Sequence, residues 1–289
     1  MAAGGGKPEG PGFFTNVKPI SLTWERDPTV FLQRAIAWCR SQGSRETPDH
    51  VIVSERMRRT TMEDRHVLTE CAGGWFGGVY DGHGGTRTVE VVAKHLHREF
   101  SQACRRGQEP EAAFRHAFAR LDRLTARYAS GTTATCVFLK GGHLTIAHIG
   151  DGRAVLIGPR GAVRQVTTDH RTDTGTERRR ILKAGGRVDR GYVVRDGHGL
   201  MVTRSFGDRV FRSVGVTAEP DVTTIRLTPR DRFLVVATDG LWDVLSNTEV
   251  ANLLTSHDWD PATMATRLRK LVAGRHGRDN LAVLGIALA

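Results

Sequence analysis

The dipeptide Asp-Gly occurs four times in this sequence, at Asp81, Asp151, Asp196 and Asp239. Each could be a plain turn, because aspartate and glycine both tolerate the positive φ angle that hairpin turns require. Asp81 and Asp239 differ from the others, since they follow the apolar runs WFGGVY and FLVVAT. We therefore expect both side chains at the C-terminal ends of buried strands, where a carboxylate without a partner is costly.

Carboxylates that converge on one point repel one another unless a cation lies between them. The divalent ions Mg²⁺ and Mn²⁺ prefer oxygen ligands of this kind. The acidic residues therefore suggest a site for divalent metal ions.

The tetrapeptide Asp-Gly-His-Gly occurs twice, at 81–84 and at 196–199. The second copy joins the short apolar runs YVV and LMV, which is typical of a hairpin turn, so we assign it no chemistry. The first copy follows a longer apolar run and precedes a helical pattern. We therefore place Asp81, but not Asp196, in the hypothetical metal site.

The elements that must position these residues are mostly short strands. Apolar runs bounded by Gly and Asp predict strands, while apolar residues three and four apart predict helices. Strands are expected at 50–54, 65–69, 74–80, 133–139, 143–149, 153–157, 192–194, 200–203, 222–227, 233–238 and 281–287. Helices are expected at 27–41, 86–104, 110–128, 173–184, 246–256 and 261–273. Hairpin-linked strands with paired helices between them indicate an α+β protein with antiparallel sheets in layers, and the absence of a βαβαβ order argues against a Rossmann-type sheet.

The 289 residues contain 42 Lys and Arg against 31 Asp and Glu, a formal net charge of +11. Such a charge favours anionic partners: phosphate groups, nucleic acid or an acidic membrane face. Aromatic residues make up only 7% and do not alternate with Arg and Lys as in a stacking platform, so we expect no nucleic-acid partner. No apolar run approaches the roughly 20 residues of a bilayer span, and residues 1–12 lack the features of a secretory or transit peptide. We expect a monomer inside the cell, in the cytoplasm or the nucleus.

Seven short motifs follow one another along the chain: 59–64 (RTTMED), 81–85 (DGHGG), 130–134 (SGTTA), 150–153 (GDGR), 203–208 (TRSFGD), 238–243 (TDGLWD) and 278–280 (RDN). In residue types, order and spacing they resemble the motifs of the type 2C metal-dependent serine/threonine protein phosphatases, the PPM family. The resemblance implies a catalytic domain over 50–289, with a central antiparallel β-sandwich of two sheets flanked by helices in four αββα layers. Residues 1–49 would then be an N-terminal extension, a flexible tail followed by the amphipathic helix expected at 27–41.

The resemblance also implies a binding site for two Mn²⁺ or Mg²⁺ ions. Asp81 would bridge the two ions. Glu63 and the backbone carbonyl of Gly82 would bind one ion, and Asp239 and Asp279 would bind the other. A hydroxide shared by the ions would attack the phosphorus of phosphoserine or phosphothreonine in a protein substrate.

Three further roles follow from the same resemblance. Asp151, with Asp239 and Asp243, would hold a weaker third ion. Arg59 would bind the substrate phosphate, for which its planar guanidinium offers two parallel donors. His83 would be the general acid that protonates the serine or threonine leaving oxygen, since an imidazole pKa of about 6.5 suits proton donation near neutral pH.

The chain departs from the family pattern beside the expected site. Gly152 and Thr203 stand where family members usually have serine, and Thr172 and Gly175 stand where two prolines are frequent. The segment 169–200, which corresponds to a flap next to the active site, is strongly basic. Its charge fits either a solvated helix face or the attraction of acidic phosphoproteins, and we favour the second.

Two other functions agree less well with the sequence. A catalytically inactive relative would bind and regulate a partner without chemistry, but the carboxylates expected to hold the ion pair, Glu63, Asp81, Asp239 and Asp279, are all present. A basic nucleic-acid-binding protein would agree with the net charge but not with the low aromatic content.

Overall fold

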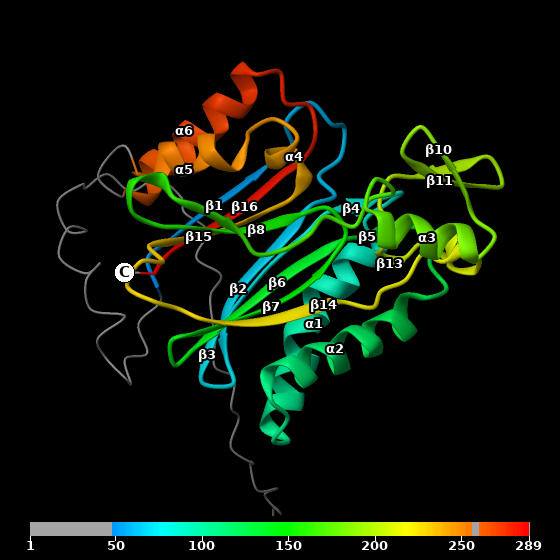
Figure 1. The fold of residues 1–289 in the computed structure, drawn as a ribbon, viewed down its shortest axis with the longest axis horizontal. Helices are drawn as coiled ribbons and strands as arrows, with labels where there is room; N and C mark the ends of the chain where they lie inside the picture. Colours follow the sequence, from blue (N-terminus) through cyan, green and yellow to red (C-terminus); the bar gives the residue numbers. More distant parts are fainter. Residues whose placement is uncertain (1–47, 256–259, 289) are drawn as a thin grey trace, which may run out of the picture. The chain divides into compact units, whose positions relative to one another are not determined.

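Two antiparallel five-stranded sheets form the centre of the fold in the computed structural model, which describes residues 48–255 and 260–288 (Figure 1). One sheet has the strand order β1 (His50–Glu55), β16 (Leu281–Ala287), β15 (Phe233–Ala237), β8 (Arg153–Ile157) and β9 (Val163–Gln165). The other has the order β14 (Asp221–Arg226), β7 (His143–Ile149), β6 (Ala134–Lys140), β3 (Gly74–Tyr80) and β2 (Arg65–Cys71).

The two sheets pack face to face around an apolar core. Leu234 and Leu284 of the first sheet belong to the same buried cluster as Val79 and Val137 of the second. Gly77 on β3 permits the close approach, because a Cβ atom at this position would lie 2.6 Å from Cδ2 of Leu284. Strands covered on both faces need continuous apolar runs, which explains why the central strands lack a polar alternation.

A pair of helices covers the outer face of each sheet (Figure 1). The rings of Phe100 and Phe114 pack against each other at a tilt, with centroids 4.3 Å apart, and Phe100 lies edge-on to Phe138 of β6. On the other side, Leu268 belongs to the same buried cluster as Val235 of β15. The pairs are α1 (Arg87–Arg105) with α2 (Pro110–Thr125), and α5 (Asn247–Thr255) with α6 (Pro261–Gly274). The four αββα layers confirm the expected α+β sandwich.

Short elements lie at one end of the sandwich. A small sheet there has the order β13 (Phe206–Gly207), β5 (Gly131–Thr132) and β4 (Gly82–His83). The flap consists of α3 (Gly175–Lys183), β10 (Arg187–Asp189), β11 (Tyr192–Arg195) and β12 (His198–Leu200).

The second Asp-Gly-His-Gly copy is the hairpin turn that the sequence predicts. Arg195 of β11 pairs with His198 of β12, so Asp196 and Gly197 form a two-residue loop. Both loop residues have positive φ angles, 48° and 78°. This conformation suits the Asp-Gly sequence, and it requires no ligand.

Most expected elements are present, with ends displaced by a few residues. The strand expected at 200–203 lies earlier, as β12, and the three-residue strands β9 and β10 were not expected. The helix expected at 27–41 and residues 1–47 of the N-terminal extension lie outside the described residues. Among the helices of the described residues, none is long and apolar enough to cross a membrane.

Candidate metal centre and active site

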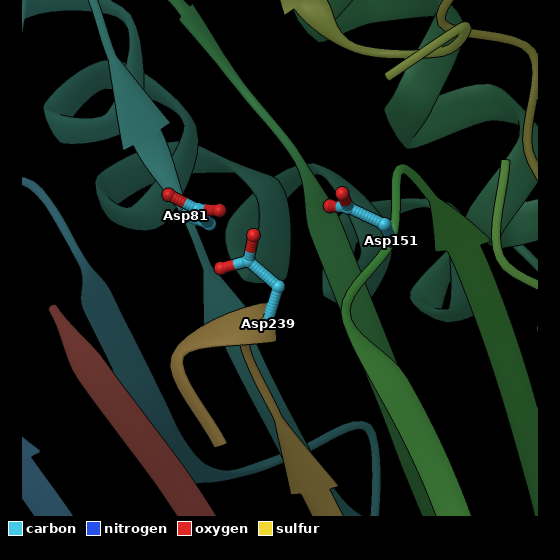
Figure 2. Close-up of side chains that lie close together, drawn as sticks. All are labelled: Asp81, Asp151 and Asp239. Carbon is cyan, nitrogen blue, oxygen red and sulfur yellow. The ribbon is translucent and has the colours of Figure 1, made fainter. Parts of the chain in front are cut away.

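Three aspartate side chains meet at one end of the sandwich, and Figure 2 shows their carboxylates turned toward a common space. Asp81 directly follows β3, Asp151 lies between β7 and β8, and Asp239 begins the short helix α4 (Asp239–Trp242) after β15. One carboxylate oxygen from each lies within 4.8 Å of the others. Because strands of both sheets end here, the sandwich itself brings together residues that are far apart in the sequence.

Burial raises the pKa of each of these three carboxylates. Burial raises the pKa of Asp81 well above its ordinary value, and the negative charges of Asp239 and Asp64 add to this. Burial, followed by the charges of Asp151 and Asp243, raises the pKa of Asp239 to about 8. A pKa raised by desolvation and like charge is typical of functional carboxylates, and the positive charge of a bound cation would offset both effects.

Asp151 supplies a direct indication that the site suits a cation. Its Oδ1 atom is buried and has no hydrogen-bond partner in the part of the chain that the structure describes. A buried carboxylate oxygen without a donor is costly unless a ligand binds it. The oxygen-only donor set matches the preference of Mg²⁺ and Mn²⁺.

The other expected ligands lie around this trio. Glu63 accepts a hydrogen bond at Oε1 from the backbone N–H of Gly85, 2.9 Å away, which holds it beside the turn that contains Gly82. Asp279 accepts a hydrogen bond from the exposed guanidinium of Arg59. The charge of Asp279 also raises the pKa values of both Asp81 and Asp239, although Asp279 is not within the close trio.

Asn280 holds the segment that carries Arg59 and Glu63, a role that the motif 278–280 did not reveal. Its Oδ1 accepts a hydrogen bond from the backbone N–H of Glu63 at 2.7 Å. Its Nδ2 donates to the backbone carbonyls of Arg56 and Thr61 at 3.1 and 3.0 Å. Three bonds from one side chain therefore fix the loop against the start of β16.

Asp64 also lies at the site, although sequence reasoning assigned it no role. Its side chain is almost fully buried and accepts a hydrogen bond from Thr238 Oγ1 at 2.8 Å. Burial raises its pKa to about 7, against the opposing effect of Thr238, and it lies within hydrogen-bond reach of Asp81. Its position next to Glu63 in the motif 59–64 could have indicated that it lies at the site.

His83 is paired with a buried carboxylate that sequence reasoning also missed. Its Nε2 lies 2.7 Å from Oδ2 of Asp208, and Ser205 donates to the same oxygen at 2.5 Å. Burial lowers the pKa of His83, but the charge and hydrogen bond of Asp208 outweigh it, so the pKa is raised. Gly131 permits this pair, because its Cβ would lie 2.1 Å from Asp208 Oδ2 and 2.2 Å from His83 Nε2.

Asp243 lies just after α4, outside the close trio. Its Oδ1 accepts a hydrogen bond from Arg171 at 3.1 Å. The same guanidinium bonds to Asp151, so the residues expected to hold a third ion are already joined by an arginine.

Residues 49–281 match the family model described as Protein phosphatase 2C. The chain belongs to this family of protein phosphatases, as the resemblance of its motifs implied. A relative from Arabidopsis thaliana, "Probable protein phosphatase 2C 14", is 36% identical over an alignment of 208 positions, which covers 68% of this chain and 46% of that protein. The human "Protein phosphatase 1F" is 31% identical over an alignment of 296 positions, which covers 96% of this chain and 63% of that protein.

The solved structures agree with the fold. The "serine-threonine phosphatase 2C from Toxoplasma gondii" has a TM-score of 0.72 and 22% sequence identity, over 83% of this chain and 94% of that chain. At this identity the likeness concerns the fold alone. The chain spans about half to two-thirds of the length of the Arabidopsis and human relatives.

Proposed function

We propose that this chain hydrolyses phosphoserine and phosphothreonine in proteins with the help of two divalent ions, Mn²⁺ or Mg²⁺. The observation that carries the proposal is the convergence of Asp81, Asp151 and Asp239, whose oxygens lie within 4.8 Å of one another. The unpartnered Oδ1 of Asp151 supports it. Family membership supports the same reaction class.

The chain's acidic residues would hold the ions. Asp81, Glu63, Asp239, Asp279 and the backbone carbonyl of Gly82 would together hold the two ions. When bound there, such ions lower the pKa of a water and neutralise charge that develops on the phosphate. The raised pKa values of Asp81 and Asp239 mean that a cation would release protons as it binds.

Arg59 and His83 would act on the substrate itself. Arg59 is exposed, and among the described residues its side chain forms an ion pair with Asp279 alone, so its other N–H groups can bind phosphate oxygens. His83 would donate a proton to the serine or threonine oxygen as the bond to phosphorus breaks. Asp208 supports this role, because its charge keeps the imidazole protonated to a higher pH.

Acidic phosphoproteins are the proposed substrates. The flap next to the site exposes Arg178, Arg179 and Lys183 on α3 and Arg187 and Arg190 beyond it. A surface of one sign raises the rate of encounter with oppositely charged partners, and the effect falls as salt is added. For the location of the protein we retain the expectation of the cytoplasm or the nucleus.

Hydrolysis of p-nitrophenyl phosphate by protein freed of metal with EDTA tests the proposal. Activity should be absent and should return with Mn²⁺ or Mg²⁺. Asp239→Asn should lower turnover by more than about 100-fold, since even residues that only support a metal ligand typically contribute about 10- to 100-fold. Asp196→Asn is the matched control: it alters the same dipeptide in the exposed hairpin turn, and asparagine tolerates the φ of 48°.

The outcomes separate the hydrolase from its alternative. Full activity in EDTA would contradict the metal dependence. A folded protein that binds Mn²⁺ but hydrolyses neither p-nitrophenyl phosphate nor a phosphopeptide would favour the catalytically inactive binding protein. Loss of activity in Asp196→Asn would show that the second Asp-Gly-His-Gly copy takes part in the chemistry and is not a plain turn.

A further inference from the structure

The guanidinium of Arg171 lies among three carboxylates at the outer side of the metal centre. Its Nε donates to Oδ2 of Asp151 at 2.9 Å, and its Nη2 donates to Oδ1 of Asp243 at 3.1 Å. The same Nη2 lies 3.7 Å from Oδ2 of Asp239. One side chain thus forms ion pairs with all three carboxylates.

These three carboxylates are the group expected from the family resemblance to hold a weaker third ion. A divalent ion there would have to share these carboxylates with Arg171, which already donates hydrogen bonds to two of the three residues. An added dication would also be repelled by the permanent charge of arginine, which no ordinary pH removes. The residues at this position therefore do not fit a third metal ion.

The backbone on both sides of Arg171 is anchored in the protein. His170 and Thr172 are buried. The backbone N–H of His170 donates to the carbonyl of Gly150 at 2.7 Å, and its carbonyl accepts from Thr203 N–H at 2.8 Å. Thr172 Oγ1 donates to the carbonyl of Gly191 at 2.7 Å. The backbone of Arg171 is thus held in place, which reduces the entropy that the side chain loses when it binds the carboxylates.

Arg171 also orients Asp151. It binds Oδ2 and leaves Oδ1 buried without a hydrogen-bond partner in the described part of the chain. One oxygen of this carboxylate is within 4.8 Å of those of Asp81 and Asp239. Asp151 therefore contacts Arg171 through Oδ2 and at the same time lies beside Asp81 and Asp239 of the two-ion site.

We infer that Arg171 is a built-in cation that replaces the third metal ion, so that the chain binds two divalent ions and no third. The inference rests on the proposed two-ion function and goes beyond it. Arg171 acts as a positioning residue: it neutralises the outer carboxylates and holds Asp151 for the inner pair.

Counting bound Mn²⁺ tests the inference without any measurement of activity. Metal-free protein is titrated into the millimolar range, and unbound Mn²⁺ is measured by electron paramagnetic resonance. The wild-type chain should bind two ions per molecule. Arg171→Met should bind a third ion with weaker affinity, because the three carboxylates lose their internal cation. Arg178→Met is the matched control: it removes one charge from an exposed site on α3, and it should still bind two ions.

Each count decides something different. Three ions in the wild-type chain would overturn the inference while leaving the two-ion hydrolase intact. Two ions in a folded Arg171→Met variant would overturn it as well, since the arginine would not be what excludes the third ion. Fewer than two ions in the wild-type chain would contradict the proposed function and the inference together. Arg171→Gln is the second variant if Arg171→Met does not fold, and the wild-type count decides independently of both.

Discussion

Glu177 is the residue whose replacement should most clearly loosen the flap. It lies on α3 and is 1% exposed. Arg180 donates two hydrogen bonds to its carboxylate, both at 2.6 Å, and Thr203 Oγ1 donates a third at 2.6 Å. Arg204 adds another contact at 2.8 Å. The carboxylate therefore joins α3 to the segment just before β13, which leads to Asp208.

The loss of folding stability expected for Glu177→Gln follows from the lowered pKa of Glu177. Burial alone would raise the pKa of Glu177, but the donors from Arg180, Arg204 and Thr203 outweigh it and lower the pKa from 4.5 to about 2. At about 1.4 kcal/mol for each pKa unit, the ionised form stabilises the fold by about 3 kcal/mol at neutral pH. Removing one partner of a buried ion pair typically costs about 3–5 kcal/mol, which agrees. The melting temperature should fall by about 6–12 °C, at about 2–4 °C per kcal/mol for a domain of this size.

The pH dependence has a defined direction. Because folding lowers the pKa of Glu177, its stabilising effect is complete above pH 4.5 and is lost as the pH falls toward about 2. The difference between wild type and Glu177→Gln should shrink to about 1.4 kcal/mol at pH 3. Urea unfolding at several pH values measures it, and Glu70→Gln on the exposed side of β2 is the control. A difference below about 1 kcal/mol at pH 7, or one that does not change with pH, would refute the reasoning.

Other substitutions test the roles proposed around the phosphate. Arg59→Ala should raise KM for a phosphopeptide about 10- to 100-fold with a smaller change in kcat, since about 1.5–3 kcal/mol of charged hydrogen bonding is lost; an unchanged KM would argue that Arg59 only pairs with Asp279. His83→Ala should lower kcat about 100- to 10,000-fold on a phosphopeptide, with a smaller loss on p-nitrophenyl phosphate, whose leaving group needs no proton. Equal losses on both substrates would show that His83 is structural. Gly131→Ala should reproduce the His83→Ala pattern, because its Cβ would separate His83 from Asp208; normal kcat in this variant would contradict the proposed role of the pair.

The sequence predicted the strands well but not their assembly. Central strands such as β6 and β7 are apolar runs bounded by Gly-Gly and Gly-Asp-Gly, so local composition was sufficient to locate them. The two-sheet sandwich came from the family resemblance, because periodicity alone does not say which strands pair. The strands β9 and β10 have three residues each, too few for an apolar pattern to be distinguished from a loop.

The aspartates of the candidate site were predictable because each stands at a recognisable place in the sequence. Asp81 and Asp239 each end an apolar run, and the structure places both in the trio with Asp151. The partners of these residues were not predictable in the same way. Asp208 is 125 positions from His83 in the sequence, and its contact depends on the pairing of β4, β5 and β13 and on the space that Gly131 leaves. Such contacts arise from tertiary packing, for which a single sequence contains no local signal.

Two arginines share the acidic end of the sandwich, and their surroundings suit them to different tasks. The Arg59 side chain is 56% exposed and binds the single carboxylate of Asp279, itself 40% exposed. An exposed pair of this kind contributes little stability, so substrate phosphate can replace the carboxylate at small cost. The Arg171 side chain is 24% exposed and lies against three carboxylates, one of them the buried Asp151. Breaking that arrangement would leave a buried charge unpaired, which is strongly destabilising. In the proposed reaction, Arg59 is therefore suited to exchange Asp279 for the substrate phosphate, whereas Arg171 is suited to remain bound to its carboxylates.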